Sequence, residues 1–187
     1  MTKSFREYWF MLLMGSFLVL YILWPLAGMF LRADWKIVAA SSMEKDVLAA
    51  LWRSIWTAAA ATGIIALFGT PLAYFLARHS FRGKAFLEAV IDVPIMVPHT
   101  VAGIAVLMAF SPKAPAGAFL VNLGLSPVNS HLGIILACLF VSIPFYVDAA
   151  RDAFYGVSPR LENVSRTLGA SFPEVFFRIS LPLARKG

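Results

Sequence analysis

The chain has 187 residues, of which 60% are hydrophobic and 14% charged, whereas soluble domains average about 45–50% and about 25%. This balance excludes an ordinary soluble domain and predicts an all-α, polytopic membrane helix bundle. The formal net charge of +6 is compatible with nucleic acid, anionic lipid or membrane topology. The single cysteine, Cys138, excludes an intrachain disulfide, and the three histidines show no metal-ligand spacing, so we expect no metal site.

The first predicted span covers residues 8–31, a run without charged residues. It is long enough to cross a hydrocarbon core of about 30 Å as a helix. A cleaved secretory signal is the alternative, but the apolar part of a signal is about 7–15 residues long. The length therefore favours a membrane span.

The second predicted span covers residues 54–77, and Pro71 should kink it near its end. Small residues let helix backbones approach closely in lipid, so we expect the face that carries them to pack on protein. These small residues are Ala58, Ala59, Ala60, Ala61, Gly63 and Gly69.

The third predicted span covers residues 85–110, where Pro94 and Pro98 interrupt the helical pattern. Residues 111–130 combine prolines and glycines with short apolar stretches, which indicates a loop with a re-entrant or interfacial turn. The fourth predicted span covers residues 131–150. The chain thus contains four predicted spans.

Charged residues flank the third and fourth spans. Lys84, Glu88 and Asp92 are spaced four residues apart, so they share one helix face and can pair near the membrane surface. Asp148 and Arg151 lie at the end of the fourth span, where an interfacial salt bridge is favoured over a proton relay.

The distribution of basic residues predicts the topology. Most of them fall in the N-terminal tail, at residues 78–84 and at residues 151–187. The positive-inside rule therefore favours a cytoplasmic N-terminus, with the four spans returning the chain to the cytoplasm. This account of the charge weakens the nucleic-acid interpretation.

The cytoplasmic segment contains signals for two short amphipathic helices. Ser158 followed by Pro159 predicts the start of the first helix, and Gly169 predicts its end. Ser171 and Glu174 form a capping box that starts the second helix, with Pro173 in its first turn. The apolar stripes consist of Leu161, Val164 and Leu168 on the first helix and Phe172, Val175, Phe176 and Ile179 on the second.

Pro182 is predicted to end the second helix. The physical interpretation of this helix–glycine–helix unit is a docking element for a cytoplasmic partner. The alternative is that its apolar stripes lie on the bilayer or on the ends of the protein's own spans.

The stretch from Leu161, LENVSRTLGASFPEVFFRISLPLARKG, resembles the EAA loop of the permease subunits of binding-protein-dependent ABC importers. In that family, nine residues separate a glycine from Ile-x-Leu-Pro, as they do here between Gly169 and Ile179. The expected Glu-Ala-Ala is replaced by Asn-Val-Ser at 163–165, and Glu162 stands one place early.

A second block, FRGKAFLEAVIDVPIMVPHTVAGIAVLMAF from Phe81, is similar to the third-span region of molybdate/tungstate permeases. The resemblance implies a membrane-spanning permease that forms the pathway for an oxyanion and is not itself an enzyme. Sulfate or another small solute is the alternative substrate. A membrane-anchored helix-turn-helix regulator is a more distant alternative, disfavoured because its recognition helix would present phenylalanines.

The resemblance also implies partners: a second copy that completes a homodimeric pore, an ABC ATPase docked on residues 158–182, an extracytoplasmic binding protein, and membrane lipid, but no nucleic acid. The chain contains no G-x-x-x-x-G-K-[ST] motif, so we expect Mg-ATP on the ATPase and no cofactor bound here. The implied docking residues are Glu162, Gly169, Ala170, Ser171, Phe172, Pro173, Glu174, Ile179, Leu181 and Pro182.

The translocation pathway is predicted at the interrupted part of the third span, because exposed backbone within a membrane is tolerated only against protein or water. His99 is a functional residue by default there, and a histidine bonded to a carbonyl for packing alone is the alternative. The predicted pathway residues are Pro94, Pro98, His99, Thr100 and Gly103. Permeases of this family resemble six-span proteins, so we expect residues 1–187 to be a C-terminally truncated single permease domain of the inner membrane.

Overall fold

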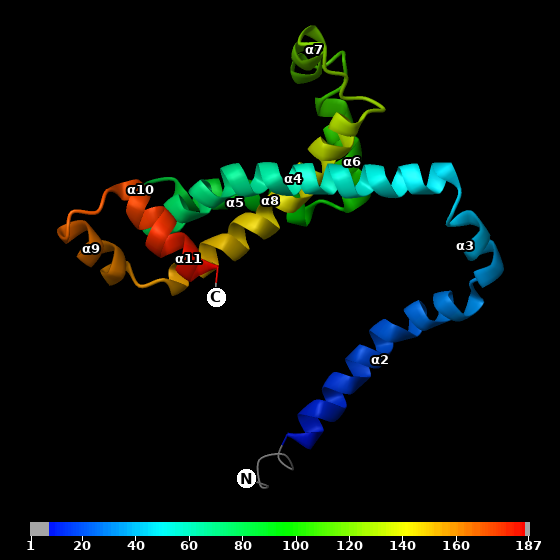
Figure 1. The fold of residues 1–187 in the computed structure, drawn as a ribbon, viewed down its shortest axis with the longest axis horizontal. Coiled ribbons are helices and arrows are strands. Elements are labelled where there is room, and N and C mark those ends of the chain that lie inside the picture. Colours follow the sequence, from blue (N-terminus) through cyan, green and yellow to red (C-terminus); the bar gives the residue numbers. More distant parts are fainter. Residues whose placement is uncertain (1–7, 186–187) are drawn as a thin grey trace. The chain divides into compact units, whose positions relative to one another are not determined.

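A computed structural model describes residues 8–185, and within them the chain is almost entirely helical and has no strand (Figure 1). Three helices, α2, α4 and α8, are long and apolar enough to cross a membrane. The helices are α2 (Trp9–Arg32), α3 (Trp35–Ser41), α4 (Lys45–Arg78), α5 (Lys84–Met96), α6 (His99–Ala109), α7 (Pro115–Asn122), α8 (His131–Gly156), α9 (Pro159–Thr167), α10 (Phe172–Val175), the π-helix η1 (Phe176–Ser180) and α11 (Leu181–Ala184).

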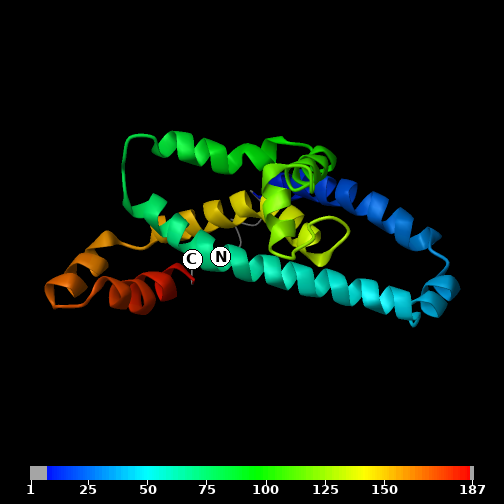
Figure 2. The same ribbon diagram turned by 90° about the horizontal axis from the view of Figure 1, so that it is seen from above.

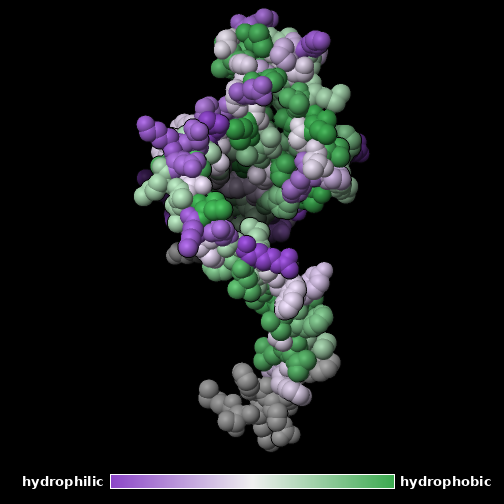
Figure 3. Space-filling model, turned by 90° about the vertical axis from the view of Figure 1, so that its right-hand side faces the viewer, coloured by the Kyte–Doolittle hydropathy of each residue, from purple (hydrophilic) through white to green (hydrophobic). Residues whose placement is uncertain are grey.

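The chain divides into two compact units, residues 1–51 and 52–187. In the first unit, the most apolar stretch of α2 has no residue buried within the chain. Figure 3 shows the apolar surface of this helix as the mostly green segment in the lower part of the view. An apolar helix that buries nothing within its own chain is suited to lipid or to a partner helix.

The second unit is built around α4, α5 and α8, which lie side by side (Figure 2). Its buried core lies toward one end of these helices, where α9 to α11 also lie. There Tyr74 from α4, Ile91 from α5, Phe154 from α8 and Phe176 from η1 pack together. The core therefore joins the spans to the segment that follows them.

The predicted third span is not one continuous helix. It is divided into α5 and α6, whose axes are bent by 113°. The break falls at Val97, whose extended backbone has φ −89° and ψ 127°, because the proline ring of Pro98 disfavours a helical conformation in the residue before it. Pro94 remains inside α5. The number of spans is three, or four if the bent pair counts as one.

Two other predicted spans are longer than their apolar stretches. α4 begins at Lys45 and α8 continues to Gly156, since a helix can extend into water beyond the apolar core. Pro71 and Pro144 both lie within these helices and do not end them. The loop at 111–130 contains helix α7, and a re-entrant or interfacial position for it stays a prediction.

The small-residue face of α4 contacts protein over part of its length. Ala61 and Gly69 are buried, whereas Ala58, Ala59 and Gly63 are exposed within this chain. Gly69 faces Tyr146 of α8, whose hydroxyl lies 2.6 Å from the Thr70 hydroxyl. The close approach of α4 and α8 therefore depends on Gly69.

Substituting Gly69 by valine should destabilise the fold by about 1–3 kcal/mol, the usual cost of overpacking. A Cβ at this position would lie 3.0 Å from Cδ1 of Tyr146. Gly63→Val is the matched control on the same helix, because no atom lies within 4 Å of its added Cβ. Thermal unfolding in detergent measures both variants, and equal midpoints would contradict the packing of α4 on α8.

Candidate functional site

The predicted coupling loop, residues 158–182, turns sharply at Gly169. Gly169 has φ +93°, a left-handed conformation that glycine adopts without cost. The N–H of Ala170 donates to the carbonyl of Ser165, and the N–H of Gly169 donates to that of Arg166, each at 3.0 Å. These two bonds form a Schellman motif, which satisfies the last carbonyls of α9. The predicted end of the first helix is therefore confirmed.

The second helix of the loop begins with the predicted capping box. Glu174 accepts hydrogen bonds from the N–H and the hydroxyl of Ser171, at 2.9 and 2.8 Å. These bonds lower the pKa of Glu174. The Arg166 guanidinium lies 5.6 Å from the centre of the Phe172 ring, so a cation–π contact spans the turn at Gly169.

The helix does not end at Pro182, as the sequence analysis had predicted, but continues to Ala184. The intervening residues 176–180 form a π-helix, in which the N–H of Leu181 donates to the carbonyl of Phe176. A π-turn shifts the hydrogen-bond register by one residue. Pro182 lies in the first turn of α11, where a helix tolerates a proline because the backbone N–H at that position is not needed for a helical hydrogen bond.

A buried cluster of polar side chains, the Arg78 cluster, fixes the loop to the spans. Its members are Arg78 and Tyr74 on α4, Glu162 on α9 and Ser180 on η1. Arg78 donates to Glu162 at 2.7 and 2.9 Å, Tyr74 donates at 3.0 Å, and Ser180 donates at 2.8 Å. The carboxylate of Glu162 on α9 therefore receives hydrogen bonds from α4 and from η1.

Arg78 also contacts the end of α8. Its guanidinium donates to the carbonyl of Phe154 at 2.9 Å and to that of Val157 at 3.0 Å. A cation is favourable there because the last carbonyls of a helix are unsatisfied and partially negative. Arg78 thus links α4, α8 and α9 through one planar group.

The Glu162 side chain is ionised in this setting. Burial alone would raise its pKa, but hydrogen bonds from Arg78, Ser180 and Tyr74, together with the Arg78 charge, outweigh burial and hold the pKa below its ordinary value. Glu162 is only 5% exposed. The sequence analysis had placed it among the docking contacts, but its burial gives it an internal role, because its partners all lie within the chain.

Aromatic rings surround the cluster. The Tyr74 ring lies 5.3 Å from that of Phe154, 5.1 Å from that of Phe176 and 6.0 Å from that of Phe172, all edge to face. Aromatic pairs at such distances add about 0.5–1.5 kcal/mol beyond their buried area. They also exclude water from the ion pair.

The outer side of the loop is apolar and has no cover within the described residues. Leu168 is 84% exposed and Phe172 is 53% exposed. A groove of about 390 Å³ lies between the end of α4 and the second helix of the loop. Further exposed apolar residues of this surface are Leu161, Val164 and Phe177. We name these five residues the loop surface.

The remaining predicted docking residues divide between the surface and the interior. Gly169, Ser171, Pro173, Glu174 and Pro182 are exposed, whereas Ala170, Ile179 and Leu181 are partly buried. Their contact with a partner stays a prediction.

The predicted pathway residues are not gathered in one place. Pro94 is buried in α5, whereas Pro98, His99 and Thr100 are exposed around the break before α6. Gly103 lines a cavity of about 820 Å³ and is the one predicted pathway residue among its lining residues. A role for these residues in translocation stays a prediction.

The charged residues near the ends of α5 and α8 form most of the expected ion pairs, but Asp92 is in no ion pair between described residues. Arg151 lies 3.1 Å from Asp148 and 3.2 Å from Glu88, and Lys84 lies 4.0 Å from Glu88. The predicted pairing of Asp148 with Arg151 is thus confirmed, and the bond from Arg151 to Glu88 also joins α8 to α5.

Sequence reasoning missed three members of the Arg78 cluster. Arg78 was counted as a topology charge, and Tyr74 and Ser180 were given no role. The available signal was Glu162 itself, an acidic residue in a helix whose other predicted contacts were apolar, since a buried acid needs a cationic partner.

Residues 69–187 match the family described as binding-protein-dependent transport system inner membrane component. The chain is 44% identical to a molybdate/tungstate transport system permease protein of Pyrococcus abyssi, over 91% of this chain and 64% of that protein. It is 42% identical to the protein of that name in Thermococcus kodakarensis, over 98% of this chain and 70% of that protein.

A similar fold occurs in a solved structure, a bacterial ABC transporter involved in the import of the acidic polysaccharide alginate. The TM-score is 0.61 at 18% sequence identity, covering 97% of this chain and 70% of that chain. The present chain spans 64% of the length of the Pyrococcus relative.

Apolar helices of spanning length and an all-helical fold define a multi-pass integral membrane protein. More narrowly, the chain belongs to the family of binding-protein-dependent transport system inner membrane components. The predicted family and fold class are therefore confirmed.

Replacing Glu162 by glutamine should destabilise the protein by roughly 3 kcal/mol, because Arg78 would stay buried without a counter-charge. Asp152→Asn is the matched control, since Asp152 is exposed and lies 3.8 Å from Arg151, and exposed pairs contribute about 0–1 kcal/mol. Thermal unfolding in detergent measures both.

The same pair gives a pH dependence with a definite sign. The folded pKa of Glu162 is lower than its ordinary 4.5, so its stabilisation is complete above that value and is lost as the pH falls through the folded pKa. Glu162→Gln should lack this acid-dependent loss. Parallel profiles for variant and wild type below pH 4.5 would contradict the assigned ion pair.

Replacing Gly169 by valine should cost about 1–3 kcal/mol through backbone strain, because a β-branched residue at positive φ is strongly disfavoured. The added Cβ meets no atom within 4 Å, so steric overlap does not contribute. Gly169→Asn should retain most of the stability, since asparagine tolerates this conformation. Limited proteolysis of the loop compares the two, and equal protection would contradict the conformational argument.

Proposed function

We propose that this chain is the membrane-spanning permease subunit of an ABC importer and forms part of the pathway for an oxyanion, molybdate or tungstate. The observation that carries the proposal is the family match over residues 69–187, which includes the Arg78 cluster and the whole coupling loop. The names of the relatives support the substrate. Sulfate is the competing substrate, because it is also a tetrahedral dianion.

The coupling loop docks an ABC ATPase, which binds and hydrolyses Mg-ATP while this chain binds no cofactor and performs no chemistry. Support comes from the loop surface, where an apolar residue as exposed as Leu168 gains free energy when a partner covers it. Because the Arg78 cluster ties the loop to α4 and α8, a displacement of the loop passes to both spans. Rigid elements moving together are a general way to alternate access.

Two further partners complete the proposed transporter. A second copy of the chain closes the pore, and an extracytoplasmic binding protein delivers the anion at the end opposite the coupling loop. The basic residues at 78–84 and 151–187 support a cytoplasmic N-terminus and a cytoplasmic loop. The lipid alternative for the loop surface predicts no ATPase contact there.

Replacing Leu168 by serine should weaken co-purification of the ATPase with the full-length permease about tenfold, because removing a buried leucine contact costs about 1.5–3 kcal/mol. The fold should be unaffected, since Leu168 is 84% exposed. Leu123→Ser is the matched control, being 60% exposed but distant from the loop.

Uptake of labelled molybdate into proteoliposomes, with ATP and the binding protein present, tests the substrate. Wild-type uptake should survive excess sulfate, and Leu168→Ser should lose uptake in proportion to the lost ATPase. If the ATPase co-purified with the Leu168→Ser variant as well as with wild type, the docking proposal would be refuted. Uptake of sulfate but not of molybdate would refute the proposed substrate.

A further inference from the structure

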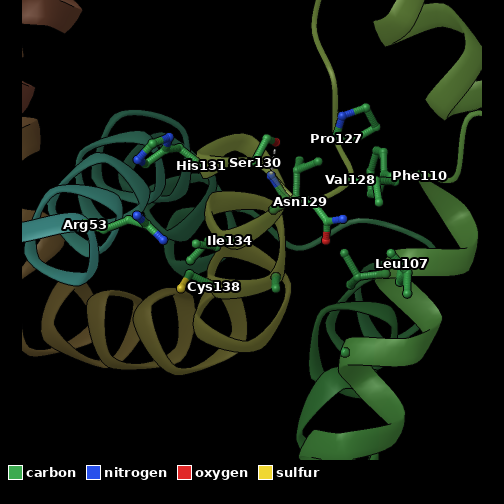
Figure 4. A pocket seen from close by; sticks show the side chains of 15 residues that line it. Arg53, Leu107, Phe110, Pro127, Val128, Asn129, Ser130, His131, Ile134 and Cys138 are labelled. Atoms are coloured by element: carbon green, nitrogen blue, oxygen red, sulfur yellow. Dashed lines mark hydrogen bonds between the residues drawn. The ribbon is translucent and has the colours of Figure 1, made fainter. Parts of the chain in front are cut away.

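The cavity of about 820 Å³ lies at the end of the second unit opposite the coupling loop. Its walls come from the beginning of α4, the end of α6, the loop before α8 and the first turns of α8 (Figure 4). Most of the lining is apolar, with Leu107, Phe110 and Ile134 among the lining residues. Ligand sites are commonly concave and apolar, with a few polar groups that converge on the ligand.

The polar groups of this cavity are donors. Arg53 reaches from α4 toward the first turns of α8, where His131 lies close by, whereas the Asn129 amide points toward α6 on the other side of these turns (Figure 4). The Ser130 hydroxyl is already used, since it donates to the carbonyl of Ser126 and accepts from the N–H of Gly133. Among the described residues that line the cavity, none is acidic.

Arg53 forms no salt bridge with another residue of the part of the chain that the structure describes. The salt bridges between described residues involve Arg78, Lys84 and Arg151, but not Arg53. Arg53 is exposed to solvent at the cavity, and a guanidinium presents planar pairs of N–H donors that match the oxygens of an oxyanion. The cavity therefore has both the charge and the donor geometry for an anion.

The geometry points to a binding site for a tetrahedral oxyanion in this cavity, with Arg53 as the principal contact. The inference deepens the proposed function and rests on it, because it names the place where the transported anion first enters this chain. The oxygens could belong to a free anion or to a lipid phosphate. Because Arg53 lines a cavity large enough to hold a small anion, we assign the site to the free anion.

Cys138 makes the site measurable. It is the single cysteine of the sequence, it is free, and it lines the same cavity. The experiment compares the rates at which an anionic and a cationic methanethiosulfonate of similar size label Cys138 in the full-length permease. The peptide that carries Cys138 is quantified by mass spectrometry. The ratio of the two rates cancels changes in the reactivity of the thiol itself.

The anionic reagent should label Cys138 faster, and Arg53→Gln should lower the ratio of rates about tenfold, the smaller end of the enrichment that a charged cleft produces. Arg53→Lys should preserve most of the ratio. Lys113→Gln is the matched control, because it removes one positive charge from the neighbouring loop but does not line the cavity. Molybdate should slow anionic labelling in wild type but not in Arg53→Gln.

Three results separate the possible failures. An unchanged ratio in Arg53→Gln, or no protection by molybdate, sulfate or phosphate, would overturn the site. Protection by sulfate but not by molybdate would support the site and refute the proposed substrate. A preference seen in non-ionic detergent but abolished in phospholipid nanodiscs would assign Arg53 to lipid phosphate and would overturn the free-anion site.

Discussion

The buried ion pair between Arg78 and Glu162 is the interaction on which the arrangement of the second unit depends. A buried charge pair is a poor source of stability, because the cost of removing two charges from water offsets most of their attraction. Its value here is geometric. Arg78 can satisfy the end of α8 and the carboxylate of Glu162 together only if α4, α8 and α9 hold one relative position. The pair therefore fixes where the loop emerges from the spans.

The packing around this pair follows from the same constraint. Aromatic rings of Tyr74, Phe154 and Phe176 surround the cluster and keep it dry, which strengthens each hydrogen bond within it. Leu168, on the outer side of the loop, lies outside this core. The loop thus combines a rigid inner side with an unsatisfied outer side, an arrangement that suits a lever between a partner and the spans.

The sequence was most informative where the signal is local. Gly169, Ser171 and Glu174 act through neighbours within a few residues, so the turn at Gly169 and the capping box could be predicted. The Arg78 cluster joins residues 84 positions apart, and no local pattern encodes such a pairing. The break at Pro98 was predicted as an interruption, but its 113° bend depends on what each half packs against. Tertiary contacts decided both cases.

The two ends of the second unit are built on opposite principles. At the loop end, a buried carboxylate neutralises Arg78, whose guanidinium donates to Glu162 and to the carbonyls of Phe154 and Val157. At the other end, Arg53 lies in an apolar cavity without an acidic lining residue. Under the proposed function such a division is useful, because force would pass through a part that does not deform, whereas an anion would enter a part that does not hold its own counter-charge. If Arg53 were paired as Arg78 is, an entering anion would have to displace a carboxylate, and that cost would fall on every transport cycle.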